Sequence, residues 1–234
     1  MEPKIEGRCG SFYGVGVGPG DPELLTLKAL RILNQCTVIA HPGKTHDSGV
    51  ALGCVRPLLA DFYKKQILSL EVPMTKDVAI LQAAYEAHVE EIVSHLEAGE
   101  DVAFLNLGDP TIYGSYMQLH QLVKAQGFEA HIIPGIPSFC GAAAELEEAL
   151  CRRREQLHII PASYDMNKAL ELSGTKVFLK SASSYGALRE LLQSYDGRVA
   201  VVCNATMDCQ EIYWGVEEMP QDVGYLTLVF VYDK

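Results

Sequence analysis

The segment from Gly14 to Asp21, Gly-Val-Gly-Val-Gly-Pro-Gly-Asp, places a glycine at every second position directly after an apolar run. Glycine has no Cβ, so this segment lets the backbone turn tightly and approach another group closely. Ser11–Val17 has the composition of a strand, and Asp21–Asn34 carries leucines at helical spacing behind an Asp21 N-cap. The chain is therefore predicted to pass from a strand through a glycine-rich turn into a helix, which is typical of α/β folds.

The spacing of glycines in the first fifty residues excludes two common nucleotide-binding motifs. A dinucleotide fingerprint needs glycines at i, i+2 and i+5, but positions 19, 21 and 23 are Pro, Asp and Glu, and residues 24–46 contain no acidic residue for a ribose. Gly43-Lys44-Thr45 is similar to the end of a P-loop, but position 38 is Val where that motif has glycine. The glycine-rich turn must therefore serve a different ligand or none.

The alternation of strand and helix patterns continues along the chain. Further strands are predicted over Thr37–Ala40, Gln66–Leu70, Asp101–Leu107, Glu129–Ile133, Leu157–Ile160, Lys176–Lys180 and Arg198–Cys203. Helices are predicted over Asp47–Leu59, Thr75–Ala98, Ile112–Ala125, Ser138–Leu150, Asp165–Leu172 and Ser184–Ser194. The first half is expected to form a parallel or mostly parallel sheet, and the tail, Ile212–Val216 and Tyr225–Tyr232, a pair of antiparallel strands.

The segment Pro134-Gly135-Ile136-Pro137 interrupts this alternation and is the predicted hinge between two α/β domains. The expected division is residues 1–133 and residues 134–234.

Composition narrows the functional class. The 234 residues are 48% hydrophobic, enough for real cores, and carry a formal charge of −11, which argues against a nucleic-acid binder or an anionic membrane surface. The seven cysteines form no C-x-x-C pair and the histidines show no metal-ligand spacing, so free thiols in a reducing cytoplasm and no metal site are expected. No targeting or membrane-spanning segment is predicted.

Two further turns follow predicted strands, over Leu107–Ser115 and over Ile133–Phe139. In open α/β sheets, ligands bind at this carboxyl edge. Asp109 either caps a helix or accepts hydrogen bonds from a ligand. The second turn is either a linker or a site with Ser138 as a cap.

Taken in order, three segments resemble the tetrapyrrole methylase family, the S-adenosylmethionine-dependent enzymes of cobalamin and sirohaem synthesis. They are Tyr13–Ala29, Gly108–Tyr113 and Pro134–Phe139. Within the family, Glu71–Asp77 and Gly224–Val229 are similar to segments of precorrin-2 C-20-methyltransferases. The chain departs from the family after its alanine-rich helix, where a Gly-x-Pro-Leu segment is replaced by the charged run Glu145–Arg154.

The resemblance implies an α/β fold of two domains with mixed sheets, a cofactor cleft between them, and a homodimer. It implies that S-adenosyl-L-methionine binds, leaving S-adenosyl-L-homocysteine as product. The residues that match the family's cofactor positions are Pro19, Leu107, Gly108, Asp109, Ile112, Pro137, Ser138, Leu179, Ala205 and Leu228.

No side chain is assigned as catalytic, although His41 and Tyr113 are candidates for a base that removes a proton after methylation. A tetrapyrrole with eight carboxylates also requires a local basic patch. Its candidate members are Lys28, Arg31, Lys44 and Arg152–Arg154.

The resemblance predicts methylation at carbon 20 of precorrin-2 or of cobalt-precorrin-2, the cobalt-factor II form, in cobalamin biosynthesis. One alternative is a sibling methyltransferase acting on another tetrapyrrole position or on a diphthamide intermediate. The other is a non-catalytic nucleotide-binding module on the same kind of scaffold.

Overall fold

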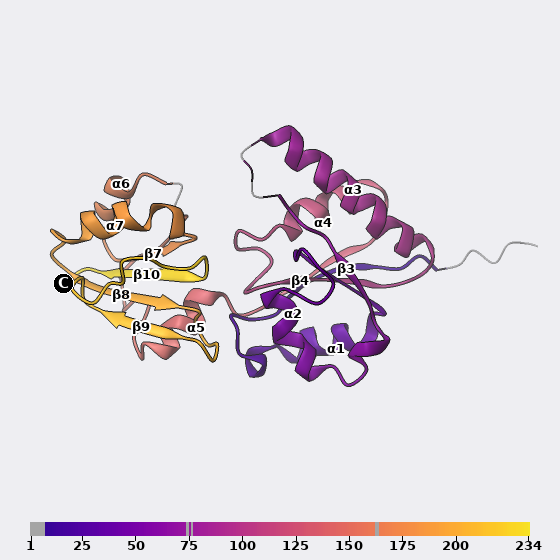
Figure 1. Cartoon of the computed structure of the whole chain (residues 1–234), viewed down its shortest axis with the longest axis horizontal. Coiled ribbons are helices and arrows are strands. Elements are labelled where there is room, and N and C mark those ends of the chain that lie inside the picture. Colours follow the sequence, from indigo (N-terminus) through magenta and orange to yellow (C-terminus); the bar gives the residue numbers. More distant parts are fainter. Residues whose placement is uncertain (1–7, 74, 76, 162–163) are drawn as a thin grey trace, which may run out of the picture. The chain divides into compact units, whose positions relative to one another are not determined.

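The computed structural model describes residues 8–73, 75, 77–161 and 164–234. It divides into two compact units, one that ends at Pro137 and one that runs from Ser138 to Lys234, each built on a five-stranded sheet (Figure 1). The dividing point lies at the end of the Pro134–Pro137 segment. Met74 and Lys76, part of one segment that resembles precorrin-2 methyltransferases, lie outside the described residues.

The sheet of the first unit is parallel throughout. Its strands are β1 (Phe12–Gly16), β2 (Val38–His41), β3 (Gln66–Ser69), β4 (Val102–Asn106) and β5 (Ala130–Ile133). They lie in the order β3-β2-β4-β1-β5. This confirms the parallel sheet expected for the first half of the chain and brings the carboxyl ends of β4, β1 and β5 side by side.

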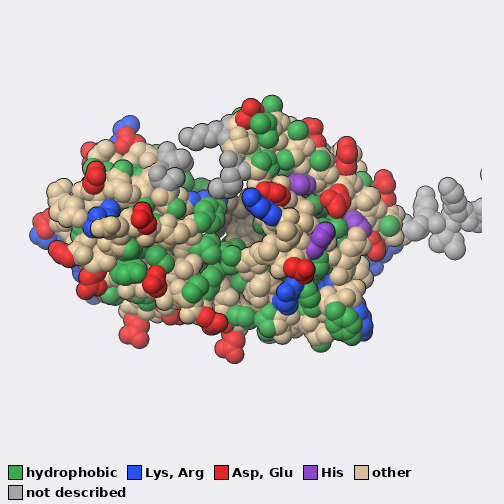
Figure 2. All heavy atoms as spheres, viewed as in Figure 1, with side chains coloured by type: hydrophobic (Ala, Val, Ile, Leu, Met, Phe, Trp, Pro, Cys, Tyr) green, Lys and Arg blue, Asp and Glu red, His purple; other side chains and the backbone are tan. Residues whose placement is uncertain are grey.

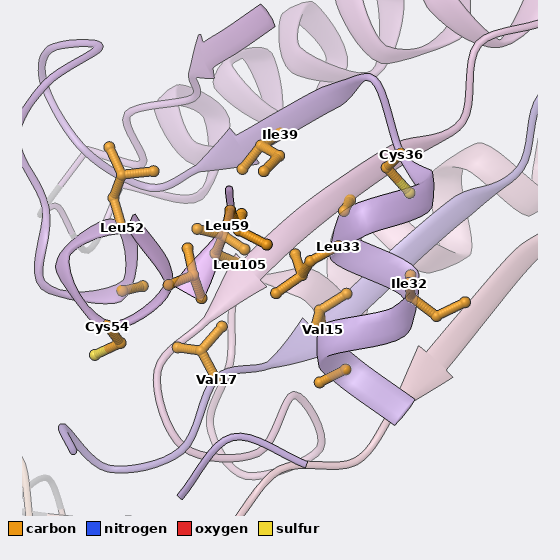
Figure 3. Close-up of a cluster of buried hydrophobic side chains, with 14 of the residues drawn as sticks. Val15, Val17, Ile32, Leu33, Cys36, Ile39, Leu52, Cys54, Leu59 and Leu105 are labelled. Atoms are coloured by element: carbon orange, nitrogen blue, oxygen red, sulfur yellow. The ribbon is translucent and has the colours of Figure 1, made fainter. Parts of the chain in front are cut away.

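Helices cover both faces of this sheet. They are α1 (Leu27–Gln35), α2 (Val50–Val55), α3 (Val78–Glu97) and α4 (Tyr116–Ala125), with 3-10 turns at Pro22–Leu24, Arg56–Leu58 and Phe62–Lys64. Leu33 of α1 and Leu52 of α2 pack with Val15 and Leu105 on one face (Figure 3). Phe12 and Phe104 face the other way and pack against α3 and α4. The strict alternation of β1 residues between the two faces is what a doubly covered strand requires.

The first helix starts later than predicted. Asp21 caps only the 3-10 turn, where its carboxylate accepts a hydrogen bond from Glu23 N at 2.8 Å. Leu25 and Thr26 are then extended, and Thr26 Oγ1 accepts from Ala29 N at 3.2 Å, so Thr26 is the N-cap of α1. The prediction of one helix over Asp21–Asn34 was wrong because the Thr26 side chain accepts the hydrogen bond of the Ala29 amide. Thr26 thereby starts a new helix, separate from the turn that Asp21 caps.

Other helices also begin late, among them the one predicted over Asp47–Leu59, which starts at Val50. The long helix starts at Val78 behind its N-cap Asp77, and the helix predicted from Ile112 starts at Tyr116. In the last case the chain first makes turns through Tyr113, which has a positive φ of 51°, and Gly114.

The sheet of the second unit is mixed. Its strands are β6 (Leu157–Pro161), β7 (Thr175–Leu179), β8 (Arg198–Cys203), β9 (Glu211–Trp214) and β10 (Thr227–Tyr232). Their order is β6-β7-β10-β8-β9, with only β6 and β7 parallel. The helices are α5 (Ser138–Glu145), α6 (Met166–Leu170) and α7 (Tyr185–Leu192), with a 3-10 turn at Ala182–Ser184. Helix α5 packs on one face, and α6 and α7 pack on the other.

The last two strands do not pair with each other, which corrects the predicted antiparallel pair. Strands β9 and β10 lie on opposite sides of β8 and each runs antiparallel to it. All six residues of β10 are buried, as suits an interior strand between β7 and β8. Helix α5 also ends at Glu145 rather than Leu150, and Glu147 adopts a positive φ of 52°.

Within the described residues, no helix combines the length and the apolar composition required to cross a lipid bilayer.

Candidate functional site

The turns that follow β1 and β4 are hydrogen-bonded to each other at the carboxyl edge of the first sheet. Val17 N donates to Asn106 O at 3.0 Å, and Gly108 N donates to Gly18 O at 2.7 Å. Gly18 and Gly108 have φ values of 77° and 73°, in the left-handed region that favours glycine. The two motifs that stood ninety residues apart in the sequence thus form one structural feature.

The turn after β5 joins this feature through direct backbone contact. A Cβ added to Gly16 would lie 2.5 Å from Gly135 N, and one added to Gly135 would lie 2.2 Å from Gly108 O. Neither position has room for a side chain, because the neighbouring atoms belong to the backbone and cannot rotate away. Gly16 and Gly135 are therefore required by the contact of their backbones with each other and with Gly108.

Asp109 fastens these turns with its side chain. Its Oδ2 accepts from Gly135 N at 3.0 Å, while its Oδ1 accepts from Thr111 N at 2.8 Å and from Thr111 Oγ1 at 2.5 Å. Of the two interpretations from the sequence, a cap of the helix that follows is wrong, since α4 begins only at Tyr116. The carboxylate instead caps a short turn and ties it to the turn after β5.

The other site residues predicted in the first unit lie close to these turns in the sequence, and they differ in their exposure to solvent. Pro19 is buried, and Leu107 and Pro137 are half-buried. Ile112 and Tyr113 are exposed by 37% and 47%, although both are large and apolar or aromatic. Apolar side chains beside a backbone-rich edge are suited to a ligand that has both flat rings and polar groups.

The second unit holds another group of predicted residues at one end of its sheet. Leu179, which ends β7, is paired in register with Leu228 near the start of β10. Ala205 follows β8 and packs in the same buried cluster. Their side chains are almost completely buried, so these positions offer backbone groups to a ligand rather than side chains. Ser138 is the first residue of α5.

Three residues with unusual backbone angles lie at this same end and were missed by the sequence reasoning. Lys180, Asn204 and Thr206 have φ values of 54°, 51° and 64°. A left-handed conformation is disfavoured for non-glycine residues and most of all for β-branched ones, and such strain clusters at functional sites. Nothing in the sequence indicates a left-handed conformation at Lys180 or Thr206. Asn204 is of a residue type that tolerates this conformation.

His41 ends β2 at the same carboxyl edge as the turns of the first unit. It is 1% exposed, and neither ring nitrogen makes a hydrogen bond within the part of the chain that the structure describes. Burial, reinforced by the nearby His46, lowers the pKa of His41 below its usual value, and the opposing effect of the Thr45 backbone is smaller than either. His41 is therefore a neutral imidazole near neutral pH.

The predicted basic residues belong to several elements of the two units. Lys28 and Arg31 are on α1, and Lys44 follows β2 and is 3.6 Å from the Glu71 carboxylate. Arg152–Arg154 belong to the second unit, where they border a hollow in its surface. Acidic side chains are scattered over both units on the face shown in Figure 2.

Comparison with protein families places these features in context. Residues 11–220 match the model of the tetrapyrrole (corrin/porphyrin) methylases. The chain is 32% identical to a precorrin-2 C(20)-methyltransferase of a Sinorhizobium species, over 95% of each protein. It is also 32% identical to the probable cobalt-precorrin-2 C(20)-methyltransferase of Methanocaldococcus jannaschii, over 94% of each. It spans only 38% of the cobalamin biosynthesis protein CobIJ of Mycobacterium tuberculosis, to which 79% of this chain aligns at 33% identity.

Solved structures show the same fold. The uroporphyrin-III C-methyltransferase of Thermus thermophilus, complexed with S-adenosylhomocysteine, aligns with a TM-score of 0.72. The alignment covers 95% of this chain and 97% of that protein at 20% identity.

Proposed function

Because this chain belongs to the tetrapyrrole (corrin/porphyrin) methylases, we propose that it methylates carbon 20 of precorrin-2 or of its cobalt complex. The observation that carries the proposal is the likeness to two C(20)-methyltransferases over at least 94% of both their lengths and its own. One of them is named for the metal-free substrate and the other for the cobalt-loaded one, so both forms belong in the test.

The proposal assigns the methyl donor S-adenosylmethionine to the two groups of residues described above. In the first unit these are Pro19, Leu107, Gly108, Asp109, Ile112 and Pro137, and in the second they are Ser138, Leu179, Ala205 and Leu228. The fit is chemical. The first group combines fixed backbone amides with the exposed side chain of Ile112. The second presents strand-end backbone beside Lys180, Asn204 and Thr206, which adopt left-handed conformations.

The donor supplies a methyl group that its sulfonium already activates, so the protein needs no nucleophile of its own. An electron-rich ring carbon attacks the methyl in line, the carbon–sulfur bond breaks, and its electron pair stays on sulfur. Positioning of this kind can contribute roughly 7–11 kcal/mol to catalysis. The glycine turns and the bonds of Asp109 give the first group of residues the rigidity that such positioning requires.

The proposal includes a homodimer in the cytoplasm. The seven cysteines, all within the described residues, are free thiols, and that state fits a reducing compartment.

The direct test incubates the protein with S-adenosylmethionine and either metal-free or cobalt-loaded precorrin-2. The expected product has gained one methyl group, and a ¹³C-labelled methyl places it at carbon 20 by NMR. A methyl group at another position would favour a sibling activity. If neither substrate gains a methyl group, the proposed reaction is wrong.

A matched pair of variants tests the cofactor assignment. Ile112→Ser should raise the KM for S-adenosylmethionine roughly threefold to tenfold, the equivalent of about 1 kcal/mol of lost apolar contact. Ile80→Ser removes the same side chain from an exposed position on α3 and should leave the KM unchanged. Equal KM values in both variants would remove Ile112 from the assigned site.

A further inference from the structure

The second unit contains a surface hollow of about 830 Å³ at the end of its sheet where β7 and β8 begin and β10 ends. Its volume is within the range of roughly 300–1,000 Å³ that is usual for small-molecule sites. Thr175, Arg198 and Tyr232 lie on its wall, and Arg152–Arg154 border it.

This hollow is separate from the residues assigned to the methyl donor in the same unit. Leu228 and Leu179 lie at the opposite ends of β10 and β7. Leu228 and Tyr232 are separated by roughly 13 Å along β10, at about 3.3 Å per residue. The hollow therefore needs an explanation of its own.

The lining of the hollow is basic, although the protein as a whole carries a formal charge of −11. Five cationic side chains line it against three acidic ones, Glu148, Glu155 and Asp233. Arg153 and Arg154 are exposed, and within the described residues neither takes part in an ion pair. Their positive charge is thus available to a ligand.

Two further arginines are held in place. Glu148 accepts from Arg152 Nη2 at 3.2 Å and from Arg198 Nη1 at 2.6 Å, so one carboxylate positions two guanidinium groups. The hydrogen bond from Arg198 helps to lower the pKa of Glu148, which keeps the carboxylate ionised. Guanidinium groups fixed in this way are suited to carboxylate and phosphate oxygens.

A second observation points to a ligand. Tyr232 is 5% exposed, and its hydroxyl has no hydrogen-bond partner among the described residues. The ring is held by Arg198, whose guanidinium carbon is 5.1 Å from the ring centre, and by stacking on Phe230. A buried hydroxyl without a partner is unfavourable, and a bound oxyanion would accept its hydrogen bond.

We propose that this hollow binds a small organic or inorganic polyanion, whose oxygens are contacted by Arg153, Arg154 and the Tyr232 hydroxyl. Its charged groups are carboxylates or phosphates. The site is additional to the methyl-transfer site, and its occupancy requires neither the methyl donor nor a tetrapyrrole.

The test is isothermal titration calorimetry of the full chain with citrate and, separately, with pyrophosphate. Ionic strength is held constant with NaCl, because exposed arginines bind any anion weakly. We expect saturable binding of at least one probe, and the tighter probe identifies the charged group. The absence of saturable binding by both probes would overturn the proposal.

Three variants locate the binding. Arg153→Ser combined with Arg154→Ser should weaken binding at least about tenfold, since two charge-assisted hydrogen-bond donors are lost. Arg8→Ser combined with Lys124→Ser removes the same charge from two exposed positions of the first unit and should leave the affinity unchanged. Equal losses in the two double variants would mean nonspecific attraction and would overturn the site.

Tyr232→Phe keeps the ring and removes only the unpartnered hydroxyl. Without a ligand its thermal midpoint should equal or exceed that of the parent, while its affinity for the probe should fall severalfold. An unchanged affinity would show that the hydroxyl does not contact the anion and would overturn this part of the assignment.

Discussion

In the first unit, three strand ends meet through the bare backbones of Gly16, Gly108 and Gly135, whereas the second unit secures one end of its sheet with side chains. There Asp233 accepts from Gly174 N at 2.5 Å and from Tyr195 Oη at 2.8 Å, and it also pairs with the Lys176 ammonium. Backbone contact leaves no freedom of residue choice, while a side-chain network tolerates exchange of its members as a set. The two arrangements should therefore respond differently to substitution.

Each unit also buries a basic side chain, and the two side chains have different surroundings. Lys176 is fully buried and bonded to both Asp233 and Tyr195. His41 is almost equally buried, and among the residues that the structure describes neither of its ring nitrogens has a hydrogen-bond partner. The contrast shows that burial of a polar group does not by itself indicate a satisfied network.

The largest expected effect is that of Gly135→Ala. Its Cβ would lie 2.2 Å from Gly108 O and 2.8 Å from the Gly16 backbone, where nothing can rotate away. We expect a loss of about 3 kcal/mol or more in the free energy of unfolding, measured by urea denaturation. Gly53→Ala is the control, because its Cβ meets nothing within 4 Å in helix α2 and should stabilise by about 0.5–1 kcal/mol.

Breaking the side-chain network of the second unit should lower the free energy of unfolding by less than Gly135→Ala does. Asp233→Ala leaves Lys176 buried without its carboxylate, and because Asp233 is 42% exposed we expect a loss of about 2–3 kcal/mol. Adding Lys176→Met should restore most of this stability, since the buried charge is then removed as well. A double variant no more stable than Asp233→Ala would contradict the description of these residues as one exchangeable set.

Much of the fold was predictable because the relevant signals are local. Apolar runs such as Arg198–Cys203 predicted strands that the structure confirms, and the glycine and proline turns predicted where strands end. The pairing of β10 between β7 and β8 was not predictable, since strand partners depend on contacts distant in sequence. The predicted start of the first helix was wrong because Thr26, and not Asp21, is the N-cap of α1.

The candidate site was predictable to the extent that it depends on glycine. Gly108 and Gly135 were visible in the sequence as parts of turns, but their contact was not, because it joins separate strands. The left-handed conformations of Lys180 and Thr206 are imposed by the surrounding fold on residues that do not favour them. The hollow beside Tyr232 likewise arises from three strand ends and a loop that only the fold brings together.

The contrast between His41 and Lys176 predicts a pH dependence of stability. Because burial lowers the pKa of His41 in the folded state, the unfolded chain binds the proton more tightly at acidic pH. The resulting loss in the free energy of unfolding should be absent well above pH 6.5. It should grow as the pH falls below 6.5, by at most about 1.4 kcal/mol per pH unit. His41→Leu should flatten the decline of the urea midpoint between pH 7 and pH 5. Parallel pH profiles for the parent and the variant would contradict the assignment of this dependence to His41.

The smallest expected effect compares left-handed positions in the two units. Lys180 has a φ of 54° and Gly18 a φ of 77°, so the same backbone region is occupied once by a disfavoured residue and once by the favoured one. Lys180→Gly should raise the free energy of unfolding by up to about 1 kcal/mol, because relief of strain exceeds the entropy that glycine adds to the unfolded chain. Lys180→Ala keeps the strain and removes the rest of the side chain, so the difference between these two variants isolates the backbone contribution. Gly18→Ala should shift stability in the opposite direction by about 1–2 kcal/mol, since it introduces the strain that Lys180 already carries.

If Lys180→Gly also lowers the rate of methyl transfer while stabilising the fold, the strain at this strand end is retained for positioning. If the rate stays equal to that of the parent, the conformation is a structural consequence of how β7 ends.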